Sequence, residues 1–499
     1  MDFAEFILAH SSDDPSALAL RRDSLAPGVE DFDLALTTLE VRRKLRLKVP
    51  EWYAVPSLRY PFRLSGEQCS SSETAFYKAA VTCCAYGATK RAKTPKNVSF
   101  IAQMVNEMRK NGFFCVNRCP MRLADLTGGL GVDTWAFSRV ATEVLYNEMK
   151  PELAAAAERN FRELGVKNVT VRNCRLEPGN ESEVLGSFVP DVIFLDPARR
   201  AEDGRKVFRL EDCQPDVLRL LPELFSAAPL IILKLSPMAD ITLVCRQLGS
   251  VREVHVVAAG GECKELLLLL ERGYEGEYVT IIYEGGSILL VDQVQGDVVD
   301  QVQRYFGRGG ISGGGPGPGT VHQNALRGTP GGPGPGDIIA PSPKSVWTRS
   351  KGHDDVWTRS KGHDDVWTRS KGHDDVWTRS KVFLFELGKA LLKAGAFDLP
   401  CRYGLQKLGR HTHYYIGEVP EELRPFGKCF EILEVQPLNN KTIKDLGKRY
   451  PQASVTARNI PITSDQLRKK LGVKDGGTVH IFGLHSDAGG NILVICSAG

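Results

Sequence analysis

Segment 123–133 constrains the fold of this chain more than any other part of the sequence. It reads Leu-Ala-Asp-Leu-Thr-Gly-Gly-Leu-Gly-Val-Asp: an apolar run that ends at Asp125, a turn with three glycines, and the start of a helix. Glycine permits positive φ and a close approach of the backbone to a ligand. The unpaired N–H groups and the dipole of the following helix point at the turn. The pattern predicts a strand, a tight turn and a helix, with a nucleotide-like ligand lying on the turn.

The order of motifs after this turn favours a particular nucleotide ligand. A dinucleotide fingerprint has the form G-x-G-x-x-G, whereas this turn is D-x-T-G-G-x-G-x-D. The strand expected at 144–148 ends in an acid that can accept both hydroxyls of a ribose. The strand expected at 191–195 runs into Asp-Pro-Ala-Arg-Arg at 196–200. A glycine turn, a ribose acid and an Asp-Pro motif in this order resemble the class I S-adenosylmethionine-dependent methyltransferases.

More of the chain resembles one group of these enzymes, the bacterial methyltransferases of the THUMP-like domain family. The resemblance covers nearly the whole chain except roughly 300–380. The matching stretches are 67–71 with 74–75 and 77–79, 125–134, 196–200 with 204–212, 234–238 with Asp240, 262–267, 392–397, and 467–471 with 474–477. The resemblance implies a Rossmann-like methyltransferase sheet, a small α+β THUMP-like domain at the C-terminal end, and S-adenosyl-L-methionine as the cofactor.

The periodicity of apolar residues supports the same fold class independently. Strands are expected near 122–126, 143–148, 168–172, 191–195, 229–235, 252–258 and 264–271, with helices near 132–139, 151–164, 211–224 and 238–248. Such alternation predicts a parallel α/β sheet covered on both faces. Only residues 259–262 separate the last two strands, too few for a crossover helix, so they must form an antiparallel hairpin. The result is a seven-stranded methyltransferase sheet, and 278–293 adds another hairpin that turns at Gly285 and Gly286.

The length and the changes in composition predict four regions. Residues 1–115 have helical periodicity, for example at 33–42 and 73–86, and 116–300 form the methyltransferase domain. Residues 301–380 are rich in glycine and proline and then repeat the decapeptide Val-Trp-Thr-Arg-Ser-Lys-Gly-His-Asp-Asp three times from Val346, with a fourth, truncated copy. This composition predicts a disordered linker, although the repeated His-Asp-Asp could bind a metal and the tryptophans could stack on bases. Residues 381–499 mix short strands and helices, as the THUMP-like domain requires.

Charge and cysteine usage limit the partners and the compartment. Residues 381–499 contain 17 Lys and Arg against 11 Asp and Glu, so the positive excess of the chain lies in its last domain. Such an excess is typical of a module that binds a polyanion, but an ordinary solvated surface can also carry it. The twelve cysteines form no CxxC pair and no zinc set, and twelve free thiols suit a reducing compartment. Without a zinc set we expect no metal. We expect no signal peptide, because the N-terminal segment is acidic and lacks an apolar core, and no membrane segment, because no run of 18 apolar residues occurs. The protein is expected in the cytoplasm, with RNA as its partner.

The donor side of the predicted site draws on the first three strands. Asp125 is expected to orient the methionine amine, directly or through the turn, and Glu148 to hold the ribose hydroxyls. Either Asn173 or Cys174, after the third strand, should contact the adenine. By the resemblance, segment 67–78 folds back over the donor pocket; otherwise it is the capped start of a helix. Backbone contacts to the donor are expected from Thr127, Gly128, Gly129 and Gly131.

The acceptor side is expected at Asp196 and Pro197. Amino-methyltransferases carry Asp/Asn-Pro-Pro-Tyr/Phe there, and the aromatic ring of that motif stacks on the base. This chain has Ala198 and Arg199 at the last two positions, so the ring is missing. Its absence counts against base N-methylation. Carbon-5 uracil methyltransferases need a cysteine after the next strand, where this chain has Ser236, which cannot replace a thiolate.

Three basic residues complete the predicted acceptor side. Arg199 and Arg200, with 205–206, would form a basic rim for phosphate or carboxylate, or an ordinary surface loop. Lys234 ends a buried strand, where an unpaired lysine is rare, so it should face Asp196. The predicted catalytic residues are therefore Asp196, Pro197 and Lys234, and the predicted substrate-binding residues are Arg199 and Arg200.

The predicted function is methyl transfer from S-adenosylmethionine to RNA. Two alternatives stay open: an RNA-binding protein with a vestigial donor pocket, and an NAD-binding Rossmann oxidoreductase. The sequence does not identify the methylated atom or the oligomeric state.

Overall fold

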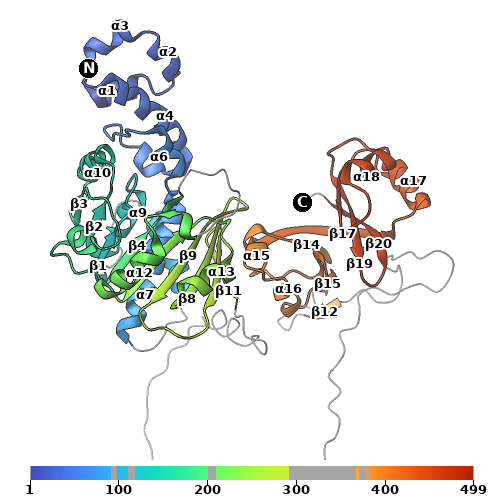
Figure 1. Cartoon of the computed structure of the whole chain (residues 1–499). Coiled ribbons are helices and arrows are strands. Elements are labelled where there is room, and N and C mark those ends of the chain that lie inside the picture. Colours follow the sequence, from blue (N-terminus) through green and yellow to red (C-terminus); the bar gives the residue numbers. More distant parts are fainter. Residues whose placement is uncertain are drawn as a thin grey trace, which may run out of the picture. The chain divides into compact units, whose positions relative to one another are not determined.

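The structure of this chain is a computed structural model that describes residues 2–91, 98–110, 119–199, 210–291, 367–369, 377–379 and 381–497. The chain divides into two compact units, which are described separately (Figure 1). Unit 1 comprises Met1–Gln293 with Leu387–Leu399 and Glu421–Lys428. Unit 2 comprises Val294–Glu386, Pro400–Pro420 and Cys429–Gly499.

Unit 1 begins with helices. They are α1 (Phe3–Ala9), α2 (Pro15–Ala19), α3 (Arg22–Leu25), the 3-10 turn η1 (Ala26–Gly28), α4 (Phe32–Lys48), α5 (Pro50–Tyr53), α6 (Arg63–Gln68), α7 (Ser72–Arg91) and α8 (Val98–Lys110). The helix α7 contacts α9 (Val132–Phe137) and the first strand of the sheet. Trp52 of α5 and Phe76 of α7 both pack on Trp135 of α9, so the helices and the sheet share one apolar core.

A nine-stranded sheet forms the centre of unit 1, in the order β11-β10-β8-β9-β7-β4-β1-β2-β3 (Figure 1). Its strands are β1 (Cys119–Asp125), β2 (Ala141–Asn147), β3 (Val169–Arg172), β4 (Val192–Leu195), β7 (Leu230–Leu235), β8 (Val251–Ala259), β9 (Glu262–Glu271), β10 (Val279–Glu284) and β11 (Ser287–Val291). The strands β3, β2, β1, β4 and β7 are mutually parallel, and β9 lies antiparallel between β7 and β8. All seven predicted strands and the predicted β8–β9 hairpin are confirmed.

The sheet is wider than the seven strands predicted. The hairpin expected at 278–293 exists as β10 and β11, but β10 also pairs parallel with β8 and so extends the sheet by two strands. Periodicity predicts that a segment is a strand, whereas the choice of a neighbour depends on the edge left free by β8. That choice could not be inferred from the segment itself.

The parallel strands are connected by α9, α10 (Pro151–Glu163), α11 (Glu181–Leu185), α12 (Val217–Ala227) and α13 (Ile241–Leu248). The predicted helix at 211–224 is wrong in its first turn and a half. Residues 210–212 form the 3-10 turn η2 (Leu210–Asp212), and β6 (Cys213–Gln214) pairs with β5 (Ala198–Arg199) in a short antiparallel ribbon. The helix starts later because Asp216 caps it, accepting from the amide of Arg219 at 3.2 Å.

The expectation of twelve free thiols is also corrected. Cys83 of α7 and Cys119 of β1 form a disulfide across a Cα–Cα distance of 6.4 Å. The two cysteines are 36 residues apart in the sequence, and only the packing of α7 against β1 brings them together. The free cysteines within the described residues number nine.

Unit 2 is built on a seven-stranded sheet of order β15-β16-β14-β17-β20-β19-β18. The strands are β14 (Phe383–Leu387), β15 (Gln406–Gly409), β16 (Thr412–Gly417), β17 (Gly427–Pro437), β18 (Ser454–Arg458), β19 (Val479–Ser486) and β20 (Gly490–Ser497). In this part of the chain, α15 (Lys389–Lys393) and the 3-10 turn η3 (Arg424–Phe426) belong to unit 1. The other helices are α16 (Leu399–Arg402), α17 (Asn440–Arg449) and α18 (Ser464–Leu471). The mixture of strands and helices predicted for 381–499 is present, and β15 and β16 are additional.

Most of the predicted linker lies outside the described residues. Within the decapeptide repeat, β12 (Trp367–Arg369) and β13 (Trp377–Arg379) pair antiparallel. Among the described residues, no helix combines the length and the apolar character needed to cross a membrane.

Candidate functional site

A pocket of about 680 Å³ opens at the carboxyl edge of the parallel strands of unit 1. In open α/β sheets this edge, near the point where the strand order reverses, is the usual ligand site. Nine of the residues singled out from the sequence line it: Asp125, Thr127, Gly128, Gly129, Gly131, Glu148, Asp196, Pro197 and Lys234. The structure therefore brings the predicted donor and acceptor residues into one cavity.

The glycine turn packs tightly on the second strand. A Cβ atom at Gly128 would lie 2.1 Å from the ring of Tyr146, and one at Gly131 would lie 2.8 Å from the ring of Phe161. Gly129, by contrast, has φ of +55° and no atom closer than 4.0 Å to such a Cβ. Internal packing thus requires glycine at 128, the backbone conformation requires it at 129, and both require it at 131, where φ is +92°.

The amide groups of the turn already have partners inside the protein. The amide of Gly128 donates to the Asn147 carbonyl at 2.8 Å, that of Gly131 to the Gly128 carbonyl at 2.9 Å, and that of Gly129 to Glu148 Oε2 at 2.9 Å. The amide of Thr127 donates to Asp125 Oδ1 at 3.2 Å. A pyrophosphate would need such N–H groups free, so this turn is poorly suited to a dinucleotide.

Asp125 is buried beneath the turn, with only 1% of its surface exposed. Its Oδ2 accepts a hydrogen bond from the Thr134 hydroxyl at 2.5 Å, which links the end of β1 to α9. Burial raises the pKa of this carboxyl group to about 7, against the smaller opposing effect of the Thr134 hydrogen bond. Asp125 can therefore act on a ligand through the turn it supports.

The raised pKa gives a testable pH dependence. The folded protein holds the Asp125 proton more tightly than the unfolded chain, so this group's contribution to stability falls as pH rises from about 4 to about 7. In Asp125→Asn, the loss of unfolding free energy between pH 5 and pH 8 should be smaller than in the wild type by about 2 kcal/mol. Guanidinium denaturation of both proteins at the two pH values measures this. Identical losses would show that Asp125 titrates in the ordinary range of a carboxyl group.

Glu148 follows β2 and is 8% exposed. Besides Gly129, it accepts the amide of Lys150 at 2.9 Å through Oε1, so its carboxylate is fixed at the pocket wall. Of the two residues expected to contact adenine, Cys174 lines the pocket. Asn173 is exposed, and its side chain donates to the Glu148 carbonyl at 2.6 Å instead. Asn173 thus supports the backbone of Glu148 without lining the pocket itself.

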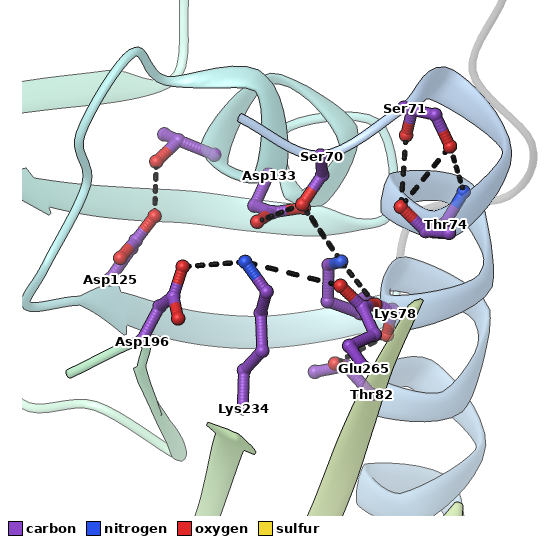
Figure 2. Close-up of polar contacts among 11 residues, drawn as sticks. Ser70, Ser71, Thr74, Lys78, Thr82, Asp125, Asp133, Asp196, Lys234 and Glu265 are labelled. Atoms are coloured by element: carbon purple, nitrogen blue, oxygen red, sulfur yellow. Dashed lines mark hydrogen bonds and ion pairs between the residues drawn. The ribbon is translucent and has the colours of Figure 1, made fainter. Parts of the chain in front are cut away.

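The acceptor side is organised by an ion pair. Lys234 Nζ donates to Asp196 Oδ2 at 2.5 Å, which confirms the expectation that these residues face each other (Figure 2). Burial alone would lower the pKa of Lys234, but the carboxylates of Asp196 and Glu265 outweigh it and raise the pKa above its ordinary value. The Asp196 amide donates to the Thr127 hydroxyl at 2.6 Å, so the Asp-Pro motif is tied to the glycine turn.

The ion pair continues into a buried network that the sequence analysis missed. Lys78 of α7 is fully buried, and its Nζ lies 2.5 Å from Glu265 Oε1, 3.2 Å from Asp133 Oδ1 and 3.0 Å from the Ser70 hydroxyl (Figure 2). The Ser70 hydroxyl donates to Asp133 Oδ2 at 2.8 Å. Glu265 Oε2 is 3.9 Å from Lys234 Nζ. The sequence shows a lysine at a buried position of the helical segment that forms α7, and such a lysine needs an acidic partner. The residues near Lys78 in the sequence do not identify that partner, which lies on β9.

Segment 65–70 contributes to the pocket wall through Ser65, Gln68, Cys69 and Ser70. The capped helix start is present, because Ser71 accepts the Thr74 amide at 3.2 Å at the beginning of α7. That this segment covers a bound donor stays a prediction.

The remaining acceptor residues are only partly described. Pro197, Ala198, Gln214 and Pro215 line the pocket beside Asp196. Arg199 lies in β5, and its side chain, Arg200 and the rest of 200–209 are outside the described residues. The proposed basic rim therefore stays a prediction.

Comparison with known proteins identifies the C-terminal region. A family model described as a THUMP domain-like domain matches residues 427–498, and one described as a ferredoxin-like domain matches 383–423. No curated protein matches the sequence significantly. The predicted THUMP-like domain is confirmed, and the ferredoxin-like segment before it is an addition.

One solved structure resembles the whole chain, and others resemble about a third of it. A protein from Porphyromonas gingivalis W83, described as a candidate methyltransferase, is 26% identical with a TM-score of 0.65, and the match covers 100% of this chain and 98% of that one. A methyltransferase from Aquifex aeolicus, described as dependent on S-adenosylmethionine, is 18% identical with a TM-score of 0.23 over 33% of this chain and 88% of its own. The strand order and the first match together show a class I methyltransferase fold, and the family model for 427–498 shows the THUMP-like domain that accompanies it.

Proposed function

We propose that this chain is an S-adenosyl-L-methionine-dependent methyltransferase that acts on RNA. The observation that carries the proposal is the pocket in which the glycine turn, Glu148 and the Asp196–Lys234 pair meet. In this proposal 1–115 form the helical domain, 116–300 the catalytic domain and 381–499 the RNA-binding domain, joined by the linker 301–380.

The pocket suits a donor with positive charge. Asp133, Glu148 and Glu265 line it and are each at most 9% exposed, and the buried Asp125 adds a fourth carboxylate above its pKa of about 7. Buried carboxylates repel a pyrophosphate but attract a sulfonium and an ammonium group. Glu148 is assigned to the ribose hydroxyls, Cys174 to the adenine side, and the turn above Asp125 to the methionine part. The same charges and the occupied turn amides argue against the NAD-dependent alternative.

The acceptor is assigned to the Asp196 side of the pocket. When bound, the donor supplies a methyl carbon already activated by positively charged sulfur, so the protein chiefly has to align the nucleophile and exclude water. The side chain of Asp196 is 37% exposed and can accept the proton that a nitrogen or oxygen nucleophile loses. Lys234 fixes the orientation of that carboxylate through its hydrogen bond to Oδ2.

The choice of RNA rests on the charge of unit 2. The helices α17 and α18 pack together and present exposed Lys444, Lys448, Lys469 and Lys470. Clustered exposed lysines attract a phosphate backbone without reading its sequence. The open alternative, an RNA-binding protein with a vestigial donor pocket, shares this surface and differs only at the donor pocket.

Calorimetry with S-adenosylmethionine, S-adenosylhomocysteine and NAD tests the donor. We expect the first two to bind, with micromolar or tighter affinity, and NAD not to bind. Binding of NAD alone would favour the oxidoreductase, and binding of none of the three, with RNA affinity retained, would favour the RNA-binding protein.

Incubation of total RNA with labelled donor, followed by nucleoside analysis, tests the substrate and identifies the methylated atom. Changing Lys444, Lys448, Lys469 and Lys470 together to Glu should abolish RNA labelling and leave donor binding unchanged.

A further inference from the structure

The buried charges around the pocket do not balance. Besides Asp125 and Glu148, three carboxylates and two ammonium groups form the network shown in Figure 2. The other basic side chains at the pocket are Lys150, Arg175 and Lys264, and all three are exposed, so water screens their charge. The buried wall of the pocket therefore carries an excess of negative charge.

The network ends in a carboxylate on both sides. The Nζ atom of Lys78 lies 3.2 Å from a carboxylate oxygen of Asp133 and 2.5 Å from one of Glu265. The Nζ atom of Lys234 lies 3.9 Å from the other oxygen of Glu265 and 2.5 Å from an oxygen of Asp196. The sequence of charges is acid, base, acid, base, acid. Except for Lys78, every member lines the pocket. An uncompensated buried charge is costly, and a cation in the pocket would remove that cost.

We propose that the Asp133–Lys78–Glu265–Lys234–Asp196 network makes the pocket select the positively charged sulfonium donor over its neutral thioether product. This inference rests on the proposed function and specifies how the same pocket treats its two nucleosides. S-adenosylmethionine and S-adenosylhomocysteine share adenine, ribose and the amino-acid group, and they differ by one methyl group and one positive charge. The network would bind the donor tightly and release the product once the charge is lost.

Coulomb's law gives the expected order of magnitude of the effect. Unit charges about 10 Å apart, at an effective dielectric constant of about 20, change a binding constant about tenfold. The two buried carboxylates of the network, Asp133 and Glu265, should therefore each favour the donor over the product about tenfold, and the buried Lys78 should oppose it by a similar factor. The side chain of Asp196 is 37% exposed, so water screens its charge and its effect on donor affinity is small.

The ratio of the two dissociation constants, product over donor, measures the selection. Calorimetry at pH 8, above the pKa of about 7 of Asp125, keeps that neighbouring charge constant. We expect Asp133→Asn and Glu265→Gln, which preserve shape, each to lower the ratio about tenfold. Lys78→Met should raise the ratio by a smaller factor, because burial already raises the pKa of Glu265 and the loss of Lys78 raises that pKa further. Changes in opposite directions cannot come from general damage to the fold, because damage weakens both ligands alike.

As a matched control, a variant removes the charge of an acidic residue that lies on the same sheet but does not line the pocket. Glu143 is 58% exposed near the start of β2 and pairs with Arg122, so Glu143→Gln should leave the ratio unchanged. An unchanged ratio in Asp133→Asn and Glu265→Gln, with both ligands weakened together, would overturn the inference and leave the network a purely structural one. If Lys78→Met does not fold, the two acid variants still decide. Failure of the wild type to bind either nucleoside would instead refute the proposed function.

Discussion

Asp196→Ala should slow methyl transfer at least about 100-fold, while the dissociation constant of S-adenosylmethionine changes less than about threefold. The side chain removed is the proton acceptor on the acceptor side of the pocket. The loop that carries it should persist, because its amide remains bound to the Thr127 hydroxyl. Single-turnover methylation with labelled donor measures the rate, and calorimetry measures the affinity.

The matched control for this prediction is an aspartate at the start of helix α13, which follows β7. Asp240 caps α13 through the Leu243 amide at 2.9 Å, and asparagine is an equally good cap. Asp240→Asn should therefore leave the rate unchanged, whereas Asp196→Asn, the same chemical change, should lower it. If Asp196→Ala instead lost donor binding, Asp196 would belong to the donor side, and its assigned role would be wrong.

The sequence predicts the part of the site that depends on strand ends. Asp125, Glu148, Asp196 and Lys234 each close or follow a strand whose apolar pattern is clear, and parallel strands bring their carboxyl ends to one edge. Their convergence on one pocket follows from the strand order alone. Their hydrogen bonds do not, which is why Asn173 could be expected at the adenine although its amide turns to the Glu148 carbonyl.

The buried network could not be predicted in the same way. Lys78 and Glu265 are 187 residues apart, and their contact depends on how α7 packs against the sheet. The Cys83–Cys119 disulfide depends on the same packing. Periodicity gives the buried face of a helix but neither its partner nor its register on that partner. The missed contacts therefore share one cause, the placement of a single helix.

Gly128→Ala should raise the dissociation constant of the donor more than about 100-fold and lower the free energy of unfolding by about 3 kcal/mol. The added Cβ would lie 2.1 Å from Cε2 of Tyr146. That ring cannot move aside, because it is fully buried, its hydroxyl donates to the Gly129 carbonyl at 2.5 Å, and Phe161 packs edge-on against it at 5.6 Å. The turn itself must shift, and the Gly129–Glu148 hydrogen bond shifts with it.

Gly129→Ala adds the same methyl group one residue later, where it meets no other atom closer than 4.0 Å. Comparing the two variants therefore distinguishes steric overlap with Tyr146 from strain in the backbone. At φ of +55°, with open space around the new Cβ, Gly129→Ala should cost only about 1–2 kcal/mol for the left-handed conformation. Donor affinity should fall less than in Gly128→Ala, and urea denaturation with calorimetry compares the two. Equal losses in both variants would mean that the turn is limited by its backbone conformation, and that its contact with Tyr146 does not hold the donor site in place.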